Sequence, residues 1–570
     1  MQKIKRKILS LIFYFFIFGL LIYTRLVGLD WGLPYPMHPD ERNMAVVVSS
    51  LRCDFSFQTF DIKECFNPYF FAYGQFSLYL AYFLLWVLKG FADFGKFAIS
   101  FEEATITLRL ISALTSIFSG VFIIKILKII TKKERFLWWL LVIFSPFFIQ
   151  FSHFGTTESL LTFFYLILIY LSLLLFERKI ALNKFIFFTS LFFGLSLATK
   201  VSSLIYSWLP IFAIFLTKEK SFYQKIFLII YFFTSSLIFS LFFSPHNFIS
   251  WKDFISSLGY ESAVALGKIV VFYTKQFDYS LPIIFPIIKI IPFALGAIGF
   301  FGIFGALVSF LTYRKDKRLI FLGFAFFIYF LPNAFLFTKW TRFFVPIFPV
   351  ILIFGILVLE KINIFLIKFL VTLLSLVLGF SYLSVYQRLD VRFSSSEWIL
   401  KNIPKNSYIL SETGNVIDIP IVNPKNKIID QKLNKNYHII SFNFYDLDKN
   451  EELQKELLYH LNRADYIIVP SRRIFANYTC SWPEKKKNFL DYLSYDKSRC
   501  DNLKKEFSLL NQYYENLFSG QLGFKKVTEF SSYPKISFLG KTWFEFPDEK
   551  AEETWTVFDH PVIRIYKREK

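Results

Sequence analysis

Charged residues are scarce in this 570-residue sequence. Asp, Glu, Lys and Arg together make up 19% of it, whereas hydrophobic residues make up 55%. Phe alone occupies 78 positions, and the mean hydropathy is +0.45. A soluble protein could not remove that much apolar surface from water. The composition therefore excludes a soluble enzyme, a secreted scaffold and a disordered chain, and it predicts a polytopic α-helical membrane protein.

Acidic residues are also outnumbered, by 43 to 64, so the net charge is +21. Such an excess would suit nucleic acid binding, but here the Lys and Arg residues stand in short clusters between apolar runs. Clusters of this kind orient a membrane protein, with the basic loops on the cytoplasmic side. We therefore interpret the charge as a signal of topology and expect no nucleic acid partner.

Eleven apolar runs predict transmembrane helices, each of roughly 20 residues. They cover residues 8–27, 106–124, 136–151, 159–176, 185–199, 201–217, 226–243, 291–312, 319–336, 343–359 and 364–384. A further apolar run at 70–88 decides the topology. If it lies along the outer face as an amphipathic or re-entrant helix, the basic clusters at 125–135, 178–184, 218–225, 314–318 and Lys361 all become cytoplasmic. We therefore predict a multi-pass protein of the cell membrane with the N-terminus inside and the C-terminus outside.

Three predicted extracytoplasmic regions are long enough to carry chemistry. They are a first loop at about 28–105, a large loop at about 244–290 and the tail, 386–570. The tail is mixed in composition, so we expect it to form a small α/β domain. Its helical stretches are 451–462 and 483–518, and its strand-like runs are 464–469 and 557–566. The chain accordingly divides into a transmembrane domain, 1–385, and an extracytoplasmic domain, 386–570.

Cysteine is rare as well. The four cysteines are Cys53, Cys65, Cys480 and Cys500, and in the preferred topology all of them lie outside the cell, where disulfides persist. The short separations favour the pairs Cys53–Cys65 and Cys480–Cys500 over four free thiols. Neither pair has the close spacing of a zinc knuckle, so we expect no zinc site.

Polar side chains gather where the predicted spans meet the outer surface. Groups of this kind near membrane depth are costly and are functional candidates. The candidates are His38, Asp40, Glu41, Arg109, His153, Glu158, Lys200, Tyr273, Gln276, Lys339 and Arg342. Their shared side predicts one outward-facing cavity lined by carboxylates and cations.

Simpler interpretations of the same residues stay open. Asp40 and Glu41 follow a proline and could cap a helix. The Lys339 side chain could extend to the lipid headgroups, as lysines at span ends commonly do. His38 and His153 could be interfacial hydrogen-bonding residues.

The order and spacing of these motifs resemble those of lipid-carrier-dependent glycosyltransferases of the GT-C fold, a group that includes protein O-mannosyltransferases and aminoarabinose transferases. The motifs of the first 385 residues are His38-Pro39-Asp40-Glu41, Asn67-Pro68, Tyr73-Gly74, Arg109 to Leu114, Ser145-Pro146, Ser152-His153-Phe154, Ala198-Thr199-Lys200 and Arg342 to Pro346. The tail resembles an extension found in some bacterial and archaeal members. Its motifs are Glu397-Trp398-Ile399, Asn402-Ile403-Pro404, Tyr513-Tyr514, Leu517-Phe518, Leu522-Gly523-Phe524, Glu552-Glu553 and Val557 to Val562.

The resemblance implies transfer of a monosaccharide from a polyprenyl-phosphate donor to an acceptor hydroxyl outside the cell, with inversion. The acceptor could be a protein, a lipid or a glycan. In that family an acidic residue matching Asp40 is regarded as catalytic, and Glu158 stands where Asp is common. The large loop lacks the motifs that distinguish protein O-mannosyltransferases. No Rossmann fingerprint is evident, which fits a lipid-linked donor rather than a nucleotide sugar.

Each candidate can be given a role in such a transfer. Asp40 is the expected base, and Glu41 and Glu158 would stabilise positive charge in the transition state. The candidates for binding the donor phosphate are Arg109, His153, Lys200, Lys339 and Arg342. His38, Tyr273 and Gln276 are expected to line the substrate cavity. No cofactor is required, although these groups would permit a divalent cation.

Two rival functions also fit a polytopic protein with buried charge. A lipid-linked-sugar flippase or transporter would spread charges through the bundle and would often contain internal repeats, and no repeat is apparent here. An inactive relative could serve as an assembly factor, but the joint presence of Asp40, Arg109 and Arg342 argues against that alternative.

Overall fold

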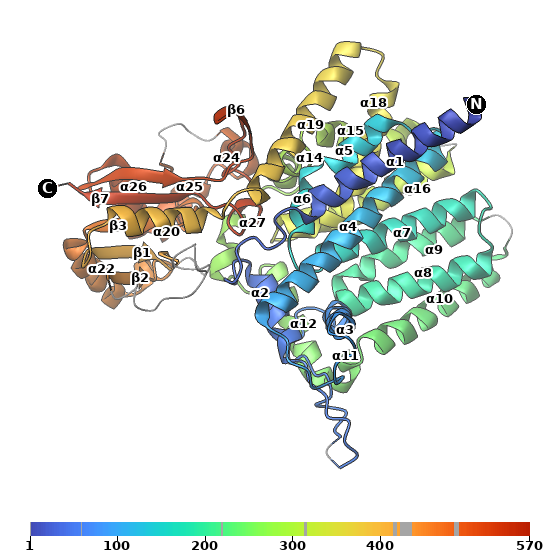
Figure 1. Ribbon diagram of the computed structural model, residues 1–570, viewed down its shortest axis with the longest axis horizontal. Helices are drawn as coiled ribbons and strands as arrows, with labels where there is room; N and C mark the ends of the chain where they lie inside the picture. The colour runs from blue at the N-terminus through green and yellow to red at the C-terminus, as the bar shows by residue number, and fades with distance from the viewer. Residues whose placement is uncertain are drawn as a thin grey trace.

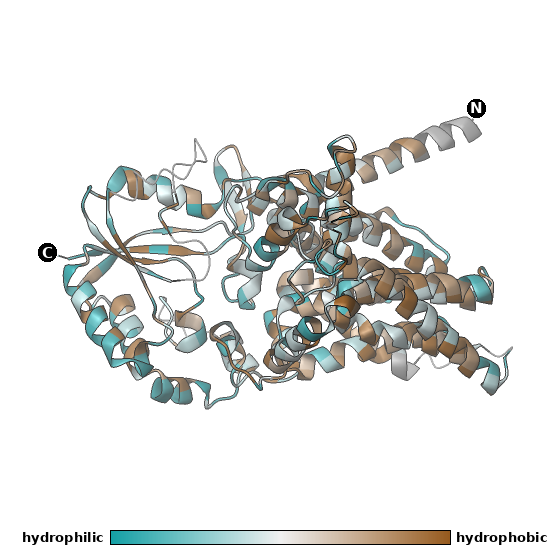
Figure 2. Ribbon diagram, turned by 90° about the horizontal axis from the view of Figure 1, so that it is seen from below, coloured by the Kyte–Doolittle hydropathy of each residue, from teal (hydrophilic) through white to brown (hydrophobic). Residues whose placement is uncertain are grey.

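The computed structural model describes residues 2–58, 60–217, 220–312, 316–413, 419–421, 436–483 and 489–569. Lys218, Arg314 and Lys315, three members of the predicted basic clusters, lie outside the described residues. A helical bundle with the N-terminus forms one part of the molecule, and a sheet with the C-terminus forms the other (Figure 1). Brown, hydrophobic ribbon dominates the bundle, whereas teal, hydrophilic segments are frequent around the sheet (Figure 2).

The bundle is formed by the helices from α1 to α19. Their bounds are α1 Gln2–Leu26, α2 Pro39–Ser50, α3 Phe76–Leu88, α4 Phe101–Thr131, α5 Phe136–Ile143, α6 Pro146–Ser152, α7 Glu158–Phe176, α8 Leu182–Thr199, η1 Val201–Ser207, α9 Trp208–Leu216, α10 Phe222–Phe243, α11 His246–Ile249, α12 Trp251–Ala265, η2 Phe272–Phe277, α13 Ile284–Lys289, α14 Ile291–Leu295, α15 Ala297–Thr312, α16 Lys317–Phe335, α17 Thr341–Phe344, η3 Val345–Ile347, α18 Phe348–Lys361 and α19 Phe365–Tyr386. Several of these helices are far shorter than a membrane span; some lie in the predicted external regions, and others are pieces of predicted spans.

Long apolar helices confirm the predicted class of membrane protein. Within the described residues, seven helices are long and apolar enough to cross a bilayer: Phe101–Thr131, Glu158–Phe176, Leu182–Thr199, Phe222–Phe243, Lys317–Phe335, Thr341–Lys361 and Phe365–Tyr386. The predicted span 8–27 corresponds to α1, whose apolar part is Leu11–Leu26, and the other three predicted spans correspond to short or interrupted helices. Pro146 begins α6 after a break, and Gly296, at a φ of +67°, separates α14 from α15. The count of eleven therefore stays a prediction.

The apolar run at 70–88 contains only the 13-residue helix α3. At about 1.5 Å per residue it is roughly 20 Å long, which is too short to cross a hydrocarbon core of about 30 Å. The helix packs against α2, α4 and α8. Its length agrees with the prediction that this run does not span the membrane.

The predicted basic loops meet at one end of the bundle. Glu177 follows α7 and forms ion pairs with Lys132 after α4 (2.7 Å) and with Arg318 at the start of α16 (3.1 Å). Arg109, by contrast, lies near the opposite end of the 31-residue helix α4, which is about 46 Å long. Basic loops and candidate site residues thus occupy opposite ends of the bundle, although the side of the membrane on which each lies stays a prediction.

The second part contains a five-stranded sheet in the order β2-β1-β3-β7-β4. Its strands are β1 Tyr408–Glu412, β2 His438–Phe442, β3 Tyr466–Val469, β4 Phe524–Phe530 and β7 Ile563–Arg568, and a separate hairpin is formed by β5 Lys535–Phe538 and β6 Lys541–Glu545. The helices are α20 Val391–Asn402, η4 Leu447–Lys449, α22 Glu451–Arg463, α23 Phe475–Tyr478, α24 Phe489–Ser494, α25 Arg499–Glu506, α26 Ser508–Ser519 and α27 Glu553–Thr556. Strands β1, β2 and β3 are parallel, and β7 is antiparallel to both β3 and β4.

Alternate side chains of the central strands enter two separate cores. In β3, Ile468 packs with Ile399 of α20 on one face, whereas Ile467 packs with Leu457 of α22 and Leu517 of α26 on the other. This alternation follows from the two-residue repeat of a strand. Helices cover both faces, so the structure confirms the predicted α/β character of this part of the chain.

Both predicted disulfides are present. Cys53 is bonded to Cys65 in the first loop, and Cys480 is bonded to Cys500 in the sheet-containing part. Each bond closes a short loop within one part of the molecule, so neither of them joins the bundle to the sheet.

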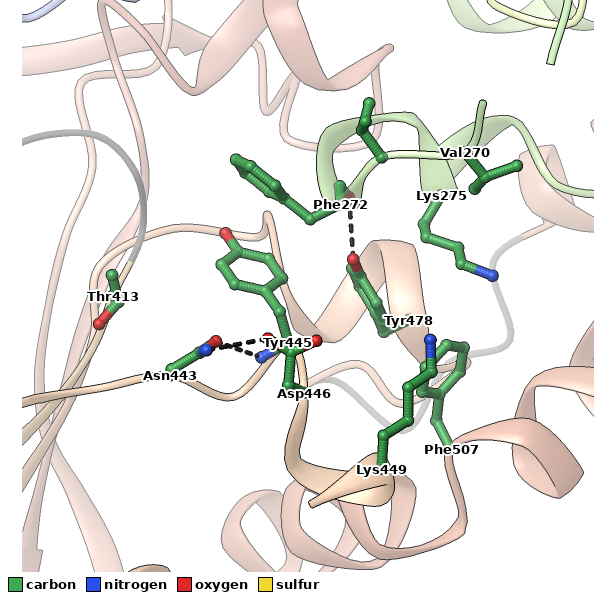
Figure 3. A pocket seen from close by; sticks show the side chains of 11 residues that line it. Val270, Phe272, Lys275, Thr413, Asn443, Tyr445, Asp446, Lys449, Tyr478 and Phe507 are labelled. Atoms are coloured by element: carbon green, nitrogen blue, oxygen red, sulfur yellow. Dashed lines mark hydrogen bonds between the residues drawn. The ribbon is translucent and has the colours of Figure 1, made fainter. Parts of the chain in front are cut away.

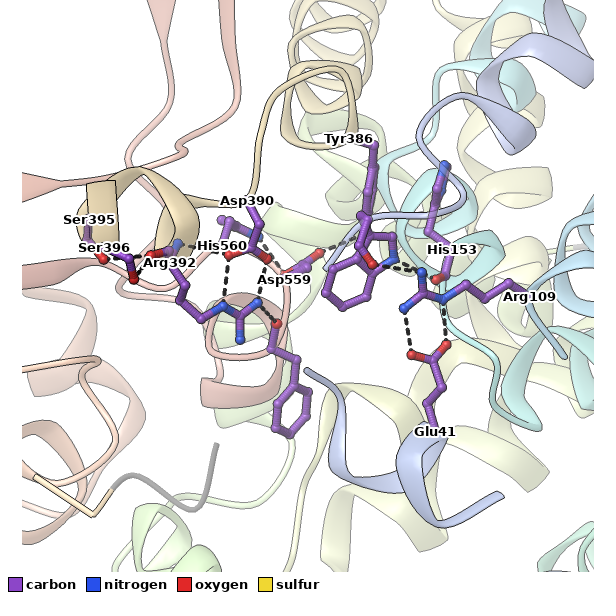
Figure 4. A network of polar contacts seen from close by, with 12 residues as sticks. Glu41, Arg109, His153, Tyr386, Asp390, Arg392, Ser395, Ser396, Asp559 and His560 are labelled. Atoms are coloured by element: carbon purple, nitrogen blue, oxygen red, sulfur yellow. Dashed lines mark hydrogen bonds and ion pairs between the residues drawn. The ribbon is translucent and has the colours of Figure 1, made fainter. Parts of the chain in front are cut away.

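A buried histidine lies where the two parts meet. The imidazole of His560 is held between the carboxylates of Asp559 (2.6 Å) and Asp548 (3.0 Å). Asp559 also accepts a hydrogen bond from the Tyr386 hydroxyl (2.7 Å; Figure 4). It accepts another from the Gln150 amide (3.1 Å). Tyr386 and Gln150 both belong to the bundle. Burial alone would lower the pKa of His560, but the two carboxylates raise this pKa to about 10.

This environment predicts a pH-dependent stability. Because the pKa of His560 rises from an ordinary value of 6.5 to about 10 on folding, its stabilising contribution is complete below about pH 6.5 and is lost as the pH rises through 10. We expect the melting temperature of the wild type to fall more steeply over this range than that of His560→Asn. Thermal unfolding at several pH values measures the difference, and parallel pH profiles would contradict the charge assignment.

Candidate functional site

The first turn of α2 carries Asp40 and Glu41, next to the chain segment that follows α1. His38 caps this helix, since its Nδ1 accepts the Glu41 N–H at 3.4 Å, and Pro39 occupies the first helical position. Two carboxylates in the first turn are favoured by the helix dipole. Burial lowers the pKa of His38, which agrees with a neutral ring that accepts a hydrogen bond. The capping group is thus His38 itself, not the adjacent carboxylates.

Glu41 points into the protein and pairs with Arg109 of α4. Both carboxylate oxygens lie 2.7 Å from guanidinium nitrogens, and the two side chains are 3% and 0% exposed (Figure 4). The Gly155 N–H donates to the same carboxylate at 2.6 Å, and a Cβ at this glycine would lie only 2.8 Å from Glu41 Oε1. Arg109 also stacks on Trp31 and donates to its carbonyl oxygen (2.8 Å). These contacts indicate that the pair fixes the first loop against α4.

Asp40 points elsewhere and forms an ion pair with Arg342 of α17. Their side chains are 24% and 22% exposed, so this pair is accessible, unlike that of Glu41. The Arg342 guanidinium lies 4.7 Å from the Trp340 ring centre. Burial opposes ionisation of Asp40, but the nearby positive charges, that of Arg342 above all, together outweigh burial and lower the pKa of this carboxyl below its ordinary value. Asp40 is therefore ionised in the structure.

A second ion pair lies beside the first. Lys200 follows the last residue of α8, and its Nζ is 3.4 Å from the carboxylate of Glu158, the first residue of α7. Lys200 acts electrostatically on Asp40, and Glu158 acts on Arg342. Two carboxylates and two cations, taken from distant parts of the chain, thus form one cluster of charges, which we call the charged cluster: Asp40, Glu158, Lys200 and Arg342.

Close backbone packing brings the first loop to this cluster. The Gly74 N–H donates to the Thr199 carbonyl oxygen at 2.9 Å, and a Cβ at Gly74 would lie 2.1 Å from the Ala198 carbonyl oxygen. Only glycine allows so close an approach. As a result, the Tyr73 ring lies below the Lys200 ammonium group, 4.8 Å from it.

The structure places His153 close to Arg109 (Figure 4). Its ring is buried and stacks on Tyr386 at 3.8 Å. Nδ1 lies 2.6 Å from the Ile149 carbonyl oxygen, and Nε2 lies 2.7 Å from that of Val27. Both nitrogens are therefore engaged by backbone, and in this arrangement the ring holds neighbouring segments together.

Three further candidates lie around the segment before Arg342. The Lys339 Nζ donates to Ser280 Oγ (3.0 Å), and burial lowers the pKa of this lysine to about 8. Gln276 donates to Glu552 of the tail at 2.7 Å. The Tyr273 ring lies 6.1 Å from the ring of Trp340, on which Arg342 stacks. Tyr273 therefore borders the charged cluster, whereas Lys339 and Gln276 bind their own local partners.

Two acidic residues near the cluster were not predicted as site residues. Glu261 of α12 interacts electrostatically with Asp40, Lys200 and Arg342, and its side chain is exposed. Glu552 accepts hydrogen bonds from the Thr341 N–H (2.9 Å) and hydroxyl (2.8 Å), so it orients the residue next to Arg342. Within the described residues, no group of three or more His, Cys, Asp and Glu side chains is arranged to hold a metal ion.

Solved structures offer a comparison for the fold. The chain is similar to the oligosaccharyltransferase AglB of Archaeoglobus fulgidus in complex with an inhibitory peptide and a dolichol-phosphate, with 12% identity, a TM-score of 0.43, and coverage of 82% of this chain and 71% of that one. ArnT of Cupriavidus metallidurans is 10% identical, with a TM-score of 0.44 and coverage of 82% of this chain and 93% of that one. The mycobacterial arabinofuranosyltransferase AftD is 13% identical, with a TM-score of 0.40 and coverage of 99% of this chain and 40% of that one.

Two of these three proteins are named as transferases, an oligosaccharyltransferase and an arabinofuranosyltransferase. No protein-family model and no curated protein matches the sequence. At such identities and TM-scores the likeness carries no argument about this chain. Neither a substrate nor a residue role is transferred from these structures.

Proposed function

We propose that this protein is a membrane glycosyltransferase that moves a monosaccharide from a polyprenyl-phosphate donor to an acceptor hydroxyl outside the cell. The observation that carries the proposal is the charged cluster, in which an accessible carboxylate, Asp40, lies against an arginine that can bind a phosphate. Lys200 provides a second cation beside it. The bundle supplies the apolar surroundings that a lipid donor needs.

In the proposed reaction Asp40 acts as the base. An acceptor hydroxyl is a poor nucleophile until its proton is removed, and an ionised carboxylate within hydrogen-bond reach can take that proton. The hydroxyl oxygen then bonds to the anomeric carbon while the bond from this carbon to the phosphate oxygen breaks. A single displacement of this kind inverts the anomeric centre. Glu158 and Glu261 would stabilise the positive charge that develops on the sugar.

Arg342 and Lys200 are proposed to bind the donor phosphate. A guanidinium can form two parallel hydrogen bonds with phosphate oxygens, and the ammonium group adds a second positive charge. Binding of the phosphate would compete with Asp40 for Arg342. Since Arg342 holds the pKa of Asp40 low, its engagement by phosphate would make this carboxylate a stronger base. Donor binding would therefore activate the base before the acceptor reacts.

Removing the Arg342 guanidinium should weaken donor binding. We expect Arg342→Gln to raise the dissociation constant for a phosphopolyprenyl sugar about 10- to 100-fold, since hydrogen bonds to charged groups contribute about 1.5–3 kcal/mol. Equilibrium binding of a labelled donor to the purified variant measures this effect. Lys132→Gln, which changes an exposed cation at the opposite end of the bundle, is the matched control. Equal donor affinity in Arg342→Gln and wild type would remove Arg342 from the phosphate site.

Release of free polyprenyl phosphate separates a transferase from a flippase. Proteoliposomes that contain the protein are supplied with a labelled donor and a crude acceptor fraction, and both products are followed. A transferase releases the lipid phosphate and labels the acceptor. Movement of intact donor across the bilayer without release would contradict the proposed function and support the flippase alternative.

A further inference from the structure

A cavity of about 500 Å³ lies where the large loop of the bundle meets the sheet (Figure 3). Its volume lies within the range of small-molecule sites, about 300–1,000 Å³. The bundle contributes Phe272 and Lys275, and the sheet-containing part contributes Thr413, Asn443 and further residues. This cavity is formed by residues other than those of the charged cluster.

The cavity lies at the carboxyl ends of neighbouring parallel strands. Thr413 directly follows β1, and Asn443 directly follows β2. In open α/β sheets, ligands bind in the crevice outside this edge, because loops that leave the strands here can present polar groups. The position of the cavity thus matches the edge of the sheet at which ligand binding is expected.

Its lining combines aromatic faces with short polar groups. Rings of Phe272, Tyr445 and Tyr478 form a continuous wall, with centroids 4.8 Å apart for the first pair and 5.6 Å apart for the second. Asn443 donates to Asp446 at 3.0 Å on the same side of the cavity. Aromatic faces stack on the C–H faces of sugar rings, and side-chain amides and carboxylates bind sugar hydroxyls.

Charges in the cavity are largely balanced by protein partners. Lys275 is paired with Asp278 (3.1 Å) and with Glu506 (2.8 Å). The Asp446 carboxylate accepts a hydrogen bond from the Asn443 amide at 3.0 Å. A lining of this kind suits a neutral polyhydroxylated ligand better than an acidic or basic peptide.

The hydroxyl of Tyr445 is the second observation that indicates a ligand. It is buried and has no hydrogen-bond partner among the described residues. An unpaired buried hydroxyl costs free energy, so a partner supplied by a ligand would remove a penalty that the protein alone carries.

We propose that this cavity binds the carbohydrate part of the acceptor. A short chain of contacts joins it to the charged cluster: Phe272 in the cavity precedes Tyr273, whose ring lies 6.1 Å from Trp340, and Arg342 stacks on Trp340 at 4.7 Å. These contacts place the cavity next to the segment that carries Arg342. The identification of this glycan as the acceptor rests on the proposed function. The binding of a glycan in the cavity does not depend on that function.

The test uses the purified full-length protein without any donor, so that no transfer occurs. A panel of neutral oligosaccharides of two to four sugars and a panel of short peptides are screened, and the tightest binder is titrated by calorimetry. We expect saturable binding of an oligosaccharide. Its affinity should fall about 3- to 10-fold in Tyr445→Phe, since this substitution removes one hydrogen bond between the protein and the ligand. Lys449→Ala should weaken binding of the same ligand. Tyr459→Phe, which changes an exposed tyrosine elsewhere on the sheet-containing part, should leave this binding unchanged.

Each outcome decides the proposal. Because the Tyr445 hydroxyl has no partner in the described residues, Tyr445→Phe should keep the wild-type melting temperature. A loss of ligand affinity in this variant then reports on the cavity alone. Binding of no oligosaccharide, equal affinity in Tyr445→Phe, or a peptide whose binding is lost in that variant would overturn the inference. Glycan binding combined with an inactive transfer assay would leave the cavity assigned and would contradict only the proposed function.

Discussion

Replacing Asp40 by Asn should reduce the rate of sugar transfer by about 10²–10⁴-fold, the range typical of losing a general base. Asparagine keeps the size of the side chain but cannot accept the proton of the acceptor hydroxyl. Because the Asp40 side chain is partly exposed, the variant should still fold. The measurement is the initial rate of polyprenyl phosphate release by the purified variant, together with its melting temperature.

The control for this substitution is another acidic residue of the first loop. Glu102 is exposed in the first turn of α4, and within the described residues it forms no ion pair with the charged cluster. Glu102→Gln should therefore retain the wild-type rate. A wild-type rate in Asp40→Asn would exclude this carboxylate as the base, whatever the behaviour of its neighbours.

Replacing Arg109 by Met should have a large effect of a different kind. It should lower the free energy of unfolding by about 3–5 kcal/mol, since it leaves the buried Glu41 carboxylate without its guanidinium partner. Thermal or denaturant unfolding in detergent measures this loss. The donor affinity of the fraction that remains folded should be unchanged, because Arg109 is fully buried against Glu41 and backbone carbonyl oxygens.

A double variant distinguishes a structural pair from a phosphate ligand. Glu41→Gln combined with Arg109→Met removes both charges, so it should be more stable than Arg109→Met alone. If Arg109 instead binds the donor phosphate, the single variant should lose donor affinity while its stability stays close to that of the wild type. That result would contradict the structural role assigned to this pair.

The class of the protein was predictable from composition, because a large excess of apolar residues has few other physical explanations. Long apolar runs likewise predicted the seven long helices. The runs that contain Pro146 or Gly296 look continuous by hydropathy, yet their helices are interrupted, since these residues act on the backbone and hardly change the average hydropathy. Hydropathy averaged over a sequence window therefore overestimates the number of unbroken helices.

The different environments of Asp40 and Glu41 could not be predicted from their positions in the sequence. The two residues are adjacent, and adjacent residues of a helix point about 100° apart, since 3.6 residues make one turn. Which of them faces the protein interior depends on where Arg109 and Gly155 lie, more than 60 residues further along the chain. Sequence alone identified both carboxylates, but only the three-dimensional arrangement separates a buried structural pair from an accessible one.

Glu552 illustrates the same limit over a longer range. It is separated by 211 residues from Thr341, whose N–H it binds. The sequence motif Glu552-Glu553 resembles part of a family extension, but a motif does not say which distant segment it contacts. Contacts between the tail and the bundle arise from tertiary packing, and they were accessible only from the folded structure.

The most direct test is a structure of the protein with a bound phosphopolyprenyl sugar. We expect the donor phosphate within hydrogen-bond distance of Arg342 and Lys200, and the anomeric carbon beside the carboxylate of Asp40, which should no longer be paired with Arg342. A phosphate bound elsewhere, with the ion pair between Asp40 and Arg342 intact, would contradict the proposed site.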